Sequence, residues 1–241
     1  MPQHKTGIAL ITGSGRRLGY TLAHTLLQRG YRVLAQYRSP TDAVQELAAQ
    51  GADLFQADFN EPEQISELLT AVQEQTQRLD VLIHNASAFQ ASAQETGHII
   101  SQFKSFFNIH MLAPALLNEG LCKLLAHDSQ RPGNIIHITD IQVIRPQPDH
   151  HLYCASKAGL SSLTQSCARR YAPGIRVNEI APGPILFADA HSEQHRRSVL
   201  AETPLGMEGG LEPVLQAVDY LINNAYVTGE RIKVDGGRSL T

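Results

Sequence analysis

The sequence predicts a doubly wound α/β fold, formed by one domain over residues 1–241. Short, nearly continuous apolar strands alternate with amphipathic helical segments along the chain, which is the pattern of a parallel sheet covered by helices on both faces. Connections between parallel strands cross back over the sheet with one hand, so that helices accumulate on its faces. A chain of 241 residues is long enough to bury such a core within one domain.

The elements follow one another in a regular order. The first unit is a strand at 7–12, a glycine turn, and a helix at 18–29 that ends before Gly30. Further strands are expected at 31–37, 52–57, 80–84, 134–139, 175–180 and 230–234, and further helices at 42–50, 62–77, 98–127, 153–171 and 211–223. Residues 184–210 lack a clear period and have proline and glycine at their ends, so we expect a mobile lid over the site.

Composition and charge indicate a protein that acts on small molecules. Hydrophobic residues make up 42% of the chain and the formal net charge is -3, which gives no basic excess to favour nucleic acid or a membrane surface as partner. The three cysteines form no CxxC pair, which favours a reducing cytoplasm over a disulfide framework. The apolar run near residue 8 is too short for a signal peptide or membrane span. We therefore expect a cytoplasmic enzyme or binding module.

The turn after the first strand is typical of a dinucleotide-binding loop. Gly13, Gly15 and Gly19 have the spacing GxGxxxG, which lets the backbone approach a pyrophosphate at a helix N-terminus. Glycines are common in strand-to-helix turns, and it is their position in the first βαβ unit that favours a cofactor site.

The end of the second strand favours NADPH over NADH. This strand ends at Tyr37, Arg38 and Ser39 without an acid, and Arg16 and Arg17 add positive charge in the glycine turn. Arginines suit the 2′-phosphate of NADPH, whereas a carboxylate would suit the ribose hydroxyls of NADH. Solvated surface arginines are the alternative interpretation.

A tyrosine, a lysine and an acid form a candidate catalytic group. Tyr153 and Lys157 lie four residues apart at the start of a predicted helix and share a face. An ammonium beside a phenol stabilises the phenolate and lowers the tyrosine pKa toward the working range. Asp140 follows the strand at 134–139 and lies thirteen residues before Tyr153. Taken alone, the acid could be a loop cap and the YxxxK pair a chance match.

Five motifs in order supply the missing context: Thr12-Gly13-xxxxx-Gly19, His84-Asn85-Ala86, Tyr153-xxx-Lys157, Ala181-Pro182-Gly183 and Val234-Asp235-Gly236-Gly237. With them the chain resembles the short-chain dehydrogenase/reductase family from residue 8 to 237. The resemblance implies a Rossmann-type sheet of about seven strands, with Tyr153 as catalytic acid and Lys157 on the nicotinamide ribose. Together with the two features above, it implies these NADPH-binding residues: Gly13, Gly15, Arg16, Arg17, Leu18, Gly19, Tyr37, Arg38, Ser39, Asp58, Phe59, Asn85, Ala86, Ser87, Tyr153, Lys157, Pro182, Gly183 and Ile185.

Several positions depart from the usual family pattern. Asp140 stands where a serine is usual, Ser87 replaces the last glycine of the NNAG turn, and Phe89 follows it. His110, four residues before Pro114, takes the place of the usual asparagine. Phe187 replaces a common threonine. This combination resembles the pteridine reductases, and the segments HNASA, IIHxTD, IAPxxILF and DGGRxL resemble the bacterial dihydromonapterin reductases.

That resemblance implies reduction of a 7,8-dihydropterin, such as dihydromonapterin, by NADPH, with weak dihydrofolate reduction, in tetrahydropterin biosynthesis and one-carbon metabolism. A flat pterin could stack on Phe89 and meet Arg17, Ser87, Asp140 and Tyr153 with its polar edge. Our hypothesis is hydride addition at C6 and a proton at N5, managed by Tyr153 and Asp140 with Lys157, while delivery of the proton by water stays open.

Two other functions are compatible with the same motifs: a general carbonyl or 3-oxoacyl reductase, and a catalytically silent NADP-binding sensor. The intact tyrosine and lysine argue against the sensor, and Asp140 argues against the general reductase. The histidines lack metal-ligand spacing, so no metal is expected. The family resemblance also suggests a homotetramer built through 98–127 and 153–171.

Overall fold

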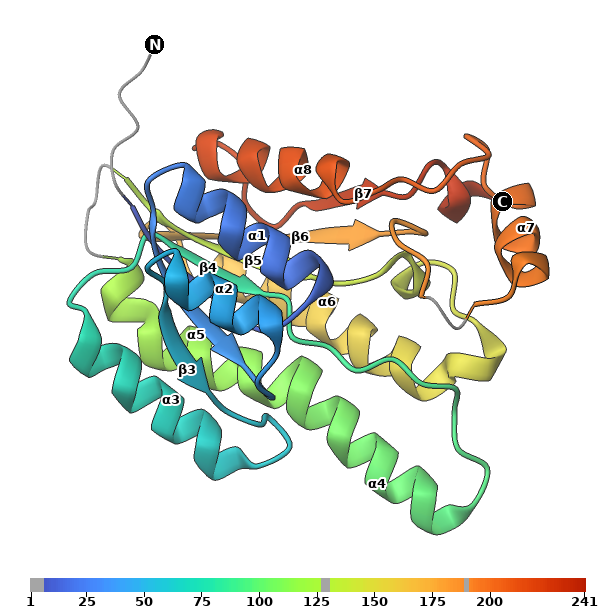
Figure 1. Ribbon diagram of the computed structural model, residues 1–241, viewed down its shortest axis with the longest axis horizontal. Coiled ribbons are helices and arrows are strands. Elements are labelled where there is room, and N and C mark those ends of the chain that lie inside the picture. Colours follow the sequence, from blue (N-terminus) through green and yellow to red (C-terminus); the bar gives the residue numbers. More distant parts are fainter. Residues whose placement is uncertain (1–6, 127–130, 189–190) are drawn as a thin grey trace.

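A parallel seven-stranded sheet lies between two layers of helices in the computed structural model, which describes residues 7–126, 131–188 and 191–241 (Figure 1). The order is β3-β2-β1-β4-β5-β6-β7, and every neighbouring pair is parallel. The predicted doubly wound class is confirmed. The strands are β1 (Ile8–Ile11), β2 (Arg32–Tyr37), β3 (Asp53–Gln56), β4 (Val81–His84), β5 (Gly133–Ile138), β6 (Ile175–Pro182) and β7 (Arg231–Val234).

Alternation along the strands divides the core in two. In β1, Ile11 belongs to the cluster under one helical layer and Leu10 to the cluster under the other, because successive side chains of a strand point to opposite faces. The first layer is α1 (Arg17–Gln28), α2 (Asp42–Ala49) and α8 (Glu212–Asn223), and the second is α3 (Pro62–Gln75), α5 (Ala113–Leu125) and α6 (His151–Tyr171) (Figure 1).

The strand order places the site. The chain moves from β1 outward to β3 and then returns to β4 on the other side of β1. At such a reversal the loops after the two central strands separate and leave a crevice at the carboxyl ends of the strands. Here the glycine turn follows β1, and the turn that contains Asn85 follows β4.

The predicted helix at 98–127 is two helices joined by a π-helical turn. The helix α4 (Thr96–Phe107) runs into the turn Asn108–Leu112, after which α5 begins. Pro114 has no N–H, and its ring crowds the carbonyl four residues earlier, which favours a widened turn at this point. The turn buries His110 completely. His127, the last residue of the predicted helix, lies outside the described residues.

The segment 184–210, expected to be irregular, contains the helix α7 (Glu193–Ala201). Ser192 caps it by accepting a hydrogen bond from the His195 N–H at 3.2 Å. None of its residues is buried and six of its nine residues are polar or charged, so its short apolar face is a weak signal from which to predict a helix. None of the helices in the described residues is apolar and long enough to span a membrane.

Candidate active site

The glycine turn is held in place by hydrogen bonds from two neighbouring strand ends. Thr12 Oγ1 accepts from the Asn85 and Ala86 N–H groups at 3.0 and 3.1 Å. The Asn85 amide donates to the Thr12 and Gly13 carbonyls, each at 3.1 Å. Gly13 has φ +70°, and a Cβ on it would lie 2.7 Å from Ala86 Cα. Asn85 therefore supports the turn with its side chain.

Gln36 is a member of this site that sequence reasoning missed. It is buried at the end of β2. Its Oε1 accepts from the Gly13 N–H at 2.8 Å, and its Nε2 donates to the Ala57 carbonyl at 2.7 Å. The signal was a glutamine inside an otherwise apolar strand, because a buried polar side chain needs partners.

The start of α1 fits a dinucleotide phosphate. The N–H groups of Arg17, Leu18 and Gly19 have no hydrogen-bond partner among the described residues, and the Arg16 side chain does not cap the helix. Free N–H groups at a helix N-terminus attract phosphate. Arg16, Arg17 and Arg38 are exposed near this turn, so cations are available for a 2′-phosphate.

The other predicted cofactor residues differ in which of their atoms are available to a cofactor. A Cβ on Gly15 would touch Tyr37 Cβ at 3.7 Å and the Ser39 carbonyl at 3.8 Å, so the end of β2 lies beside the turn. Asp58 Oδ1 accepts from the Asn60 N–H at 2.9 Å and from Nδ2 of the same residue at 3.1 Å. Phe59 is 4% exposed and packs in the core. Its side chain is therefore unable to contact a cofactor, and only its backbone is available.

A Gly19→Ala substitution should disrupt the turn. A Cβ at this position would overlap the Gly13 carbonyl and approach the Asn85 amide. We expect a loss of about 1–3 kcal/mol in the free energy of unfolding, together with weaker NADPH binding, measured by urea unfolding and fluorescence titration. Gly97→Ala is the matched control, because its added Cβ meets nothing within 4 Å. Equal behaviour of the two variants would contradict the expectation.

Asp140 and Tyr153 form a directly hydrogen-bonded pair. The Tyr153 hydroxyl donates to Asp140 Oδ2 at 2.8 Å. Asp140 Oδ1 accepts from the Gln142 N–H at 2.8 Å and caps the short 3-10 helix Ile141–Val143. Each carboxylate oxygen of Asp140 thus accepts a different hydrogen bond. Tyr153 is only 5% exposed, so the pair lies in a poorly solvated position.

The expectation that Lys157 lowers the tyrosine pKa is wrong for this structure. Burial, and then the neighbouring Asp140 charge, raise the pKa of Tyr153 well above its usual value. Burial likewise raises the pKa of Asp140. Desolvation disfavours the charged form of both groups, and a phenolate beside a carboxylate is disfavoured further. Tyr153 is therefore a protonated donor at neutral pH.

Lys157 lies behind the pair and is almost completely buried. Its Nζ donates to the Ile138 carbonyl at 2.8 Å and lies 5.9 Å from the centroid of the Tyr153 ring. Burial lowers its pKa from 10.5 to about 8. The ammonium therefore persists at neutral pH, close to the tyrosine ring.

This shift predicts a pH dependence of stability. Between pH 8 and 10.5 the unfolded chain binds more protons at Lys157 than the folded chain does, so the free energy of unfolding rises with pH there. Below about pH 8 the free energy of unfolding is lowered by the full cost of burying the charged ammonium, and above pH 10.5 this cost is absent. We expect wild type to gain stability relative to Lys157→Met as the pH increases through the window, measured by urea unfolding. A difference independent of pH would contradict the assignment.

Ser87 and Phe89 lie on the open side of the pair. The Ser87 hydroxyl is 2.9 Å from His110 Nε2. The Phe89 ring is 50% exposed, stacks on His150 with centroids 4.5 Å apart, and meets Tyr153 edge-on at 4.8 Å. One aromatic surface is thus fixed beside Tyr153 and partly open to a ligand. These residues come from the segments after β4 and β5 and from the start of α6, and the structure brings them together.

The other edge of the site is formed by the segment after β6. The Gly183 N–H donates to the Val234 carbonyl at 2.9 Å, and the Arg17 guanidinium donates to the Leu186 carbonyl. Arg17 has φ +48°, an uncommon conformation for a residue other than glycine. Arg17 therefore connects the glycine turn to residues 184–188, the start of the predicted lid. Residues 189–190 of that lid lie outside the described part of the chain.

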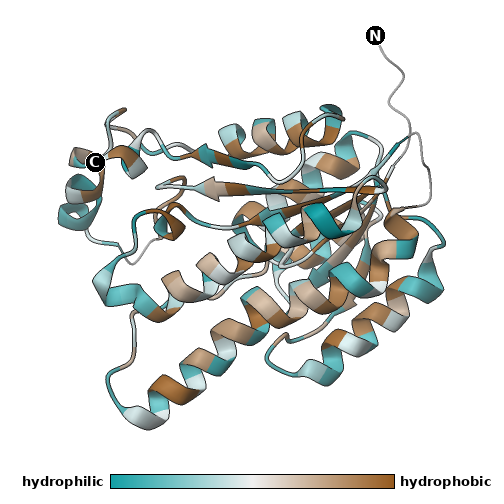
Figure 2. Ribbon diagram, turned by 180° about the vertical axis from the view of Figure 1, so that it is seen from behind, coloured by the Kyte–Doolittle hydropathy of each residue, from teal (hydrophilic) through white to brown (hydrophobic). Residues whose placement is uncertain are grey.

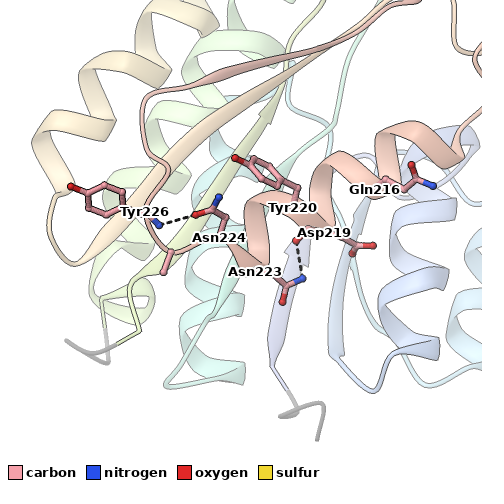
Figure 3. Close-up of a pocket in the computed structure, with 7 residues that line it drawn as sticks. Gln216, Asp219, Tyr220, Asn223, Asn224 and Tyr226 are labelled. Carbon is pink, nitrogen blue, oxygen red and sulfur yellow. Dashed lines mark hydrogen bonds between the residues drawn. The ribbon is translucent and has the colours of Figure 1, made fainter. Parts of the chain in front are cut away.

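One cavity lies next to this site and another lies away from it. One of about 510 Å³ is lined by residues that include Pro184, Ile185, Met207 and Val234, next to the segment after β6. The other, of about 650 Å³, lies on α8 and the turn after it, where Tyr220 and Tyr226 line it (Figure 3). None of the predicted site residues lines the second cavity. Within the described residues no three His, Cys, Asp or Glu side chains form a group that could hold a metal.

Comparisons with known proteins identify the family and the fold. A family model described as enoyl-(acyl carrier protein) reductase matches residues 13–239. The chain belongs to the short-chain dehydrogenase/reductase family. Its relatives include dihydromonapterin reductases from Enterobacter sp. (strain 638), 40% identical over 232 residues, and from Escherichia coli (strain SMS-3-5 / SECEC), 36% identical over 231 residues, with 96% of each chain covered in both comparisons.

Two solved structures have similar folds. The alternative dihydrofolate reductase 1 FolM from Brucella canis, complexed with NADP, has a TM-score of 0.87 and 27% identity, covering 98% of this chain and 94% of the other. The RhlG/NADP complex from Pseudomonas aeruginosa has a TM-score of 0.88 and 27% identity, covering 99% of both chains. The predicted family and fold are thereby confirmed.

Proposed function

We propose that this chain is an NADPH-dependent dihydropterin reductase that converts 7,8-dihydromonapterin to its tetrahydro form, with weak activity on dihydrofolate. The observation that carries the proposal is the Tyr153–Asp140 hydrogen bond of 2.8 Å, which lies beside the half-exposed Phe89 ring. An acid at this position departs from the usual family pattern. Support comes from the relatives named dihydromonapterin reductase and from the NADP complex of FolM.

The chemistry requires a hydride at C6 and a proton at N5 of the dihydropterin C=N bond. NADPH, when bound, supplies the hydride. Tyr153 holds a proton next to Asp140, which orients the hydroxyl and accepts from it. Lys157 keeps a positive charge behind the ring, Phe89 supplies a stacking surface, and Ser87 meets the polar edge of the pterin. Holding the reacting groups in one geometry lowers the entropic part of the barrier.

The cofactor proposal is supported by the cradle at the start of α1. The open N–H groups there and the exposed arginines fit a diphosphate and a 2′-phosphate. The proposed contacts are the glycine turn, the end of β2, Asp58, the Asn85 turn, Tyr153 and Lys157, and Pro182 to Ile185, with Phe59 limited to its backbone.

One assay tests the function. The rate of NADPH oxidation is measured side by side with dihydromonapterin, dihydrofolate and a simple ketone, and each reaction is repeated with NADH. We expect dihydromonapterin with NADPH to be the best pair. Equal rates on all three substrates would contradict the pterin assignment, and equal rates with both cofactors would contradict the role of the arginines.

The assembly we propose is a homotetramer built through α4 and α5 together with α6. The residues Ile100, Phe103 and Phe107 of α4 are 51%, 53% and 45% exposed, and their spacing places them on one face. The helix extends from the body of the molecule and carries hydrophobic (brown) segments (Figures 1 and 2). An apolar stripe of this kind commonly marks a protein interface.

The substitution Phe103→Asp should lower the mass measured by light scattering, because a carboxylate would be buried in the interface. Ser101→Asp, on the same helix but off the stripe, is the control and should leave the mass unchanged. A wild-type mass near that of one 26.4 kDa chain would overturn the tetramer.

We also propose a cytoplasmic location and a role in tetrahydropterin and one-carbon metabolism. The free state of all three cysteines supports the cytoplasmic location. Cell fractionation tests it.

The segment 184–210 is proposed as the substrate lid. The hydrogen bond between Arg17 and the Leu186 carbonyl supports this, because it joins the segment to the cofactor turn. Slower hydrogen exchange in this segment when NADPH and a pterin are both bound is the expected result. Exchange that is unaffected by both ligands would contradict a lid.

A further inference from the structure

His110 is the buried residue at the centre of the site that the proposed chemistry does not use. It lies in the π-helical turn with no exposed surface. Its Nδ1 is 2.8 Å from Ser156 Oγ and its Nε2 is 2.9 Å from Ser87 Oγ. The ring also stacks on Phe106 with centroids 5.7 Å apart. The ring is thus held by packing and by both nitrogens, so its orientation is fixed.

Two independent contacts decide which nitrogen carries the proton. The Ala88 N–H donates to Nε2 at 3.3 Å, which requires a lone pair on Nε2. On the other side, the Ser156 hydroxyl donates to the Tyr153 backbone carbonyl at 2.7 Å, and a carbonyl can only accept. Ser156 has one proton to give, so its oxygen must accept from Nδ1–H. Both contacts assign the same tautomer, with the proton on Nδ1.

The ring also stays neutral. Burial, and then the charge of Lys157, hold the pKa of His110 well below its usual value, which agrees with the lone pair that Ala88 requires at Nε2. A neutral ring with both nitrogens engaged is a poor proton shuttle. Its contribution to the site therefore passes through the groups that it contacts.

The tautomer determines what Ser87 can do. The Tyr153 hydroxyl is a second neighbour of Ser87. Since Nε2 is an acceptor and lies 2.9 Å away, we assign the single Ser87 proton to the hydrogen bond with His110. The Ser87 oxygen then presents only lone pairs to the open side of the site, where the residue is exposed. An approaching N–H group would form a hydrogen bond with this oxygen. An approaching carbonyl oxygen would meet lone pairs and be repelled.

We infer that His110 is a positioning residue that fixes the Ser87 hydroxyl as a hydrogen-bond acceptor, so that the site selects a substrate with an N–H donor at this point and rejects a simple ketone. The inference deepens the proposed function and rests on it for the identity of the substrate. It differs from a proton-relay role, because it predicts an effect on substrate choice that acts through Ser87.

Two variants of His110 distinguish the effect of the hydrogen-bond acceptor at Nε2 from the effect of the aromatic ring. His110→Phe keeps an aromatic ring but removes both nitrogens, whereas His110→Gln can place an amide oxygen near the position of Nε2. The measured quantity is the ratio of kcat/KM for dihydromonapterin to kcat/KM for a simple ketone. We expect the ratio to fall about tenfold or more in His110→Phe, because Ser87 becomes free to donate, and to be largely restored in His110→Gln. NADPH affinity and the urea midpoint of each variant report on folding.

A double-mutant cycle tests whether the effect passes through Ser87. In a Ser87→Ala background, His110→Phe should change the selectivity ratio little, because the group that it would release is absent. A selectivity change of full size in that background would overturn the inference. So would an unchanged ratio in folded His110→Phe.

Spectroscopy gives a readout that does not depend on any substrate. In wild-type protein with ¹⁵N-labelled histidine, the His110 signal, assigned by its loss in His110→Gln, should show a protonated Nδ1 and a bare Nε2 that do not titrate between pH 6 and 9. A proton on Nε2 would overturn the inference even if dihydropterin is reduced. If wild type fails to reduce dihydropterin, the proposed function fails, and the part of the inference that concerns the substrate fails with it. The spectroscopic result would still test whether His110 accepts the proton of the Ser87 hydroxyl.

Discussion

Tyr153→Phe is expected to lower kcat/KM for dihydropterin reduction by about 10²–10⁴-fold, the range that a positioned general acid contributes. The hydroxyl is the group that donates to Asp140 at 2.8 Å, and its removal leaves the buried carboxylate without that donor. Burial and the carboxylate keep the hydroxyl protonated at neutral pH, so a proton is present at this position for the proposed transfer. The measurement is steady-state NADPH oxidation with dihydromonapterin.

Two controls accompany this variant. NADPH should still bind and lose no more than the contact of the Tyr153 hydroxyl, because the cradle for the phosphates lies on α1 and not on α6. The Phe89 ring contacts the Tyr153 ring, and phenylalanine retains that contact, so folding should be preserved. Turnover near wild type would show that water alone delivers the proton, and the role assigned to Tyr153 would then be wrong.

Asp140→Ser is expected to lower dihydropterin turnover about 100-fold while raising turnover of a simple ketone. The substitution removes the acceptor of the Tyr153 hydroxyl and puts a hydroxyl donor at the position where most of the family has a serine, and losses of this size are usual for groups that orient a proton. Serine can still cap the following turn, which Asp140 now caps through the Gln142 N–H. The variant should therefore fold.

The matched control is Asp149→Ser, which removes an exposed acid from the 3-10 helix Pro148–His150 just before α6. It should leave both activities unchanged. Asp140→Asn adds a further comparison, because it keeps the shape and removes the charge. If Asp140→Ser retained its pterin turnover, the acid would be no more than a cap, and the assignment of the substrate class would lose its main structural support.

The sequence predicted the sheet and most of its boundaries because the signals are local. Apolar runs such as 80–84 and amphipathic segments such as 211–223 report burial directly through their period. The helix α7 was missed for the same reason, since it buries no residue and its short apolar face is too weak a local signal. The π-helical turn was also missed, because both its flanks are helical in pattern and only the effect of Pro114 on the packed turn distinguishes it.

Some features of the candidate site could likewise be predicted from the sequence, and others could not. The glycine turn, Tyr153, Lys157 and Asp140 follow from motif spacing and chain order. The structure brings the last three together after the end of β5 and near the start of α6. Phe59 follows the motif, but its side chain points into the core. The direction of the Tyr153 pKa shift was wrong in the sequence-based prediction, because spacing identifies Lys157 as a neighbour but does not show how deeply the pair is buried.

The fold and the glycine turn could be predicted from the sequence, and so could candidates for the residues that carry the chemistry, because these depend on local periodicity and on motif order. Only the tertiary structure decided what each polar atom of the site does. Asp140 uses one oxygen to cap a turn and the other to accept from Tyr153, and His110 uses its two nitrogens on two different serines. The physical reason is that hydrogen-bond direction depends on which donors and acceptors remain unpaired once all the neighbours are in place.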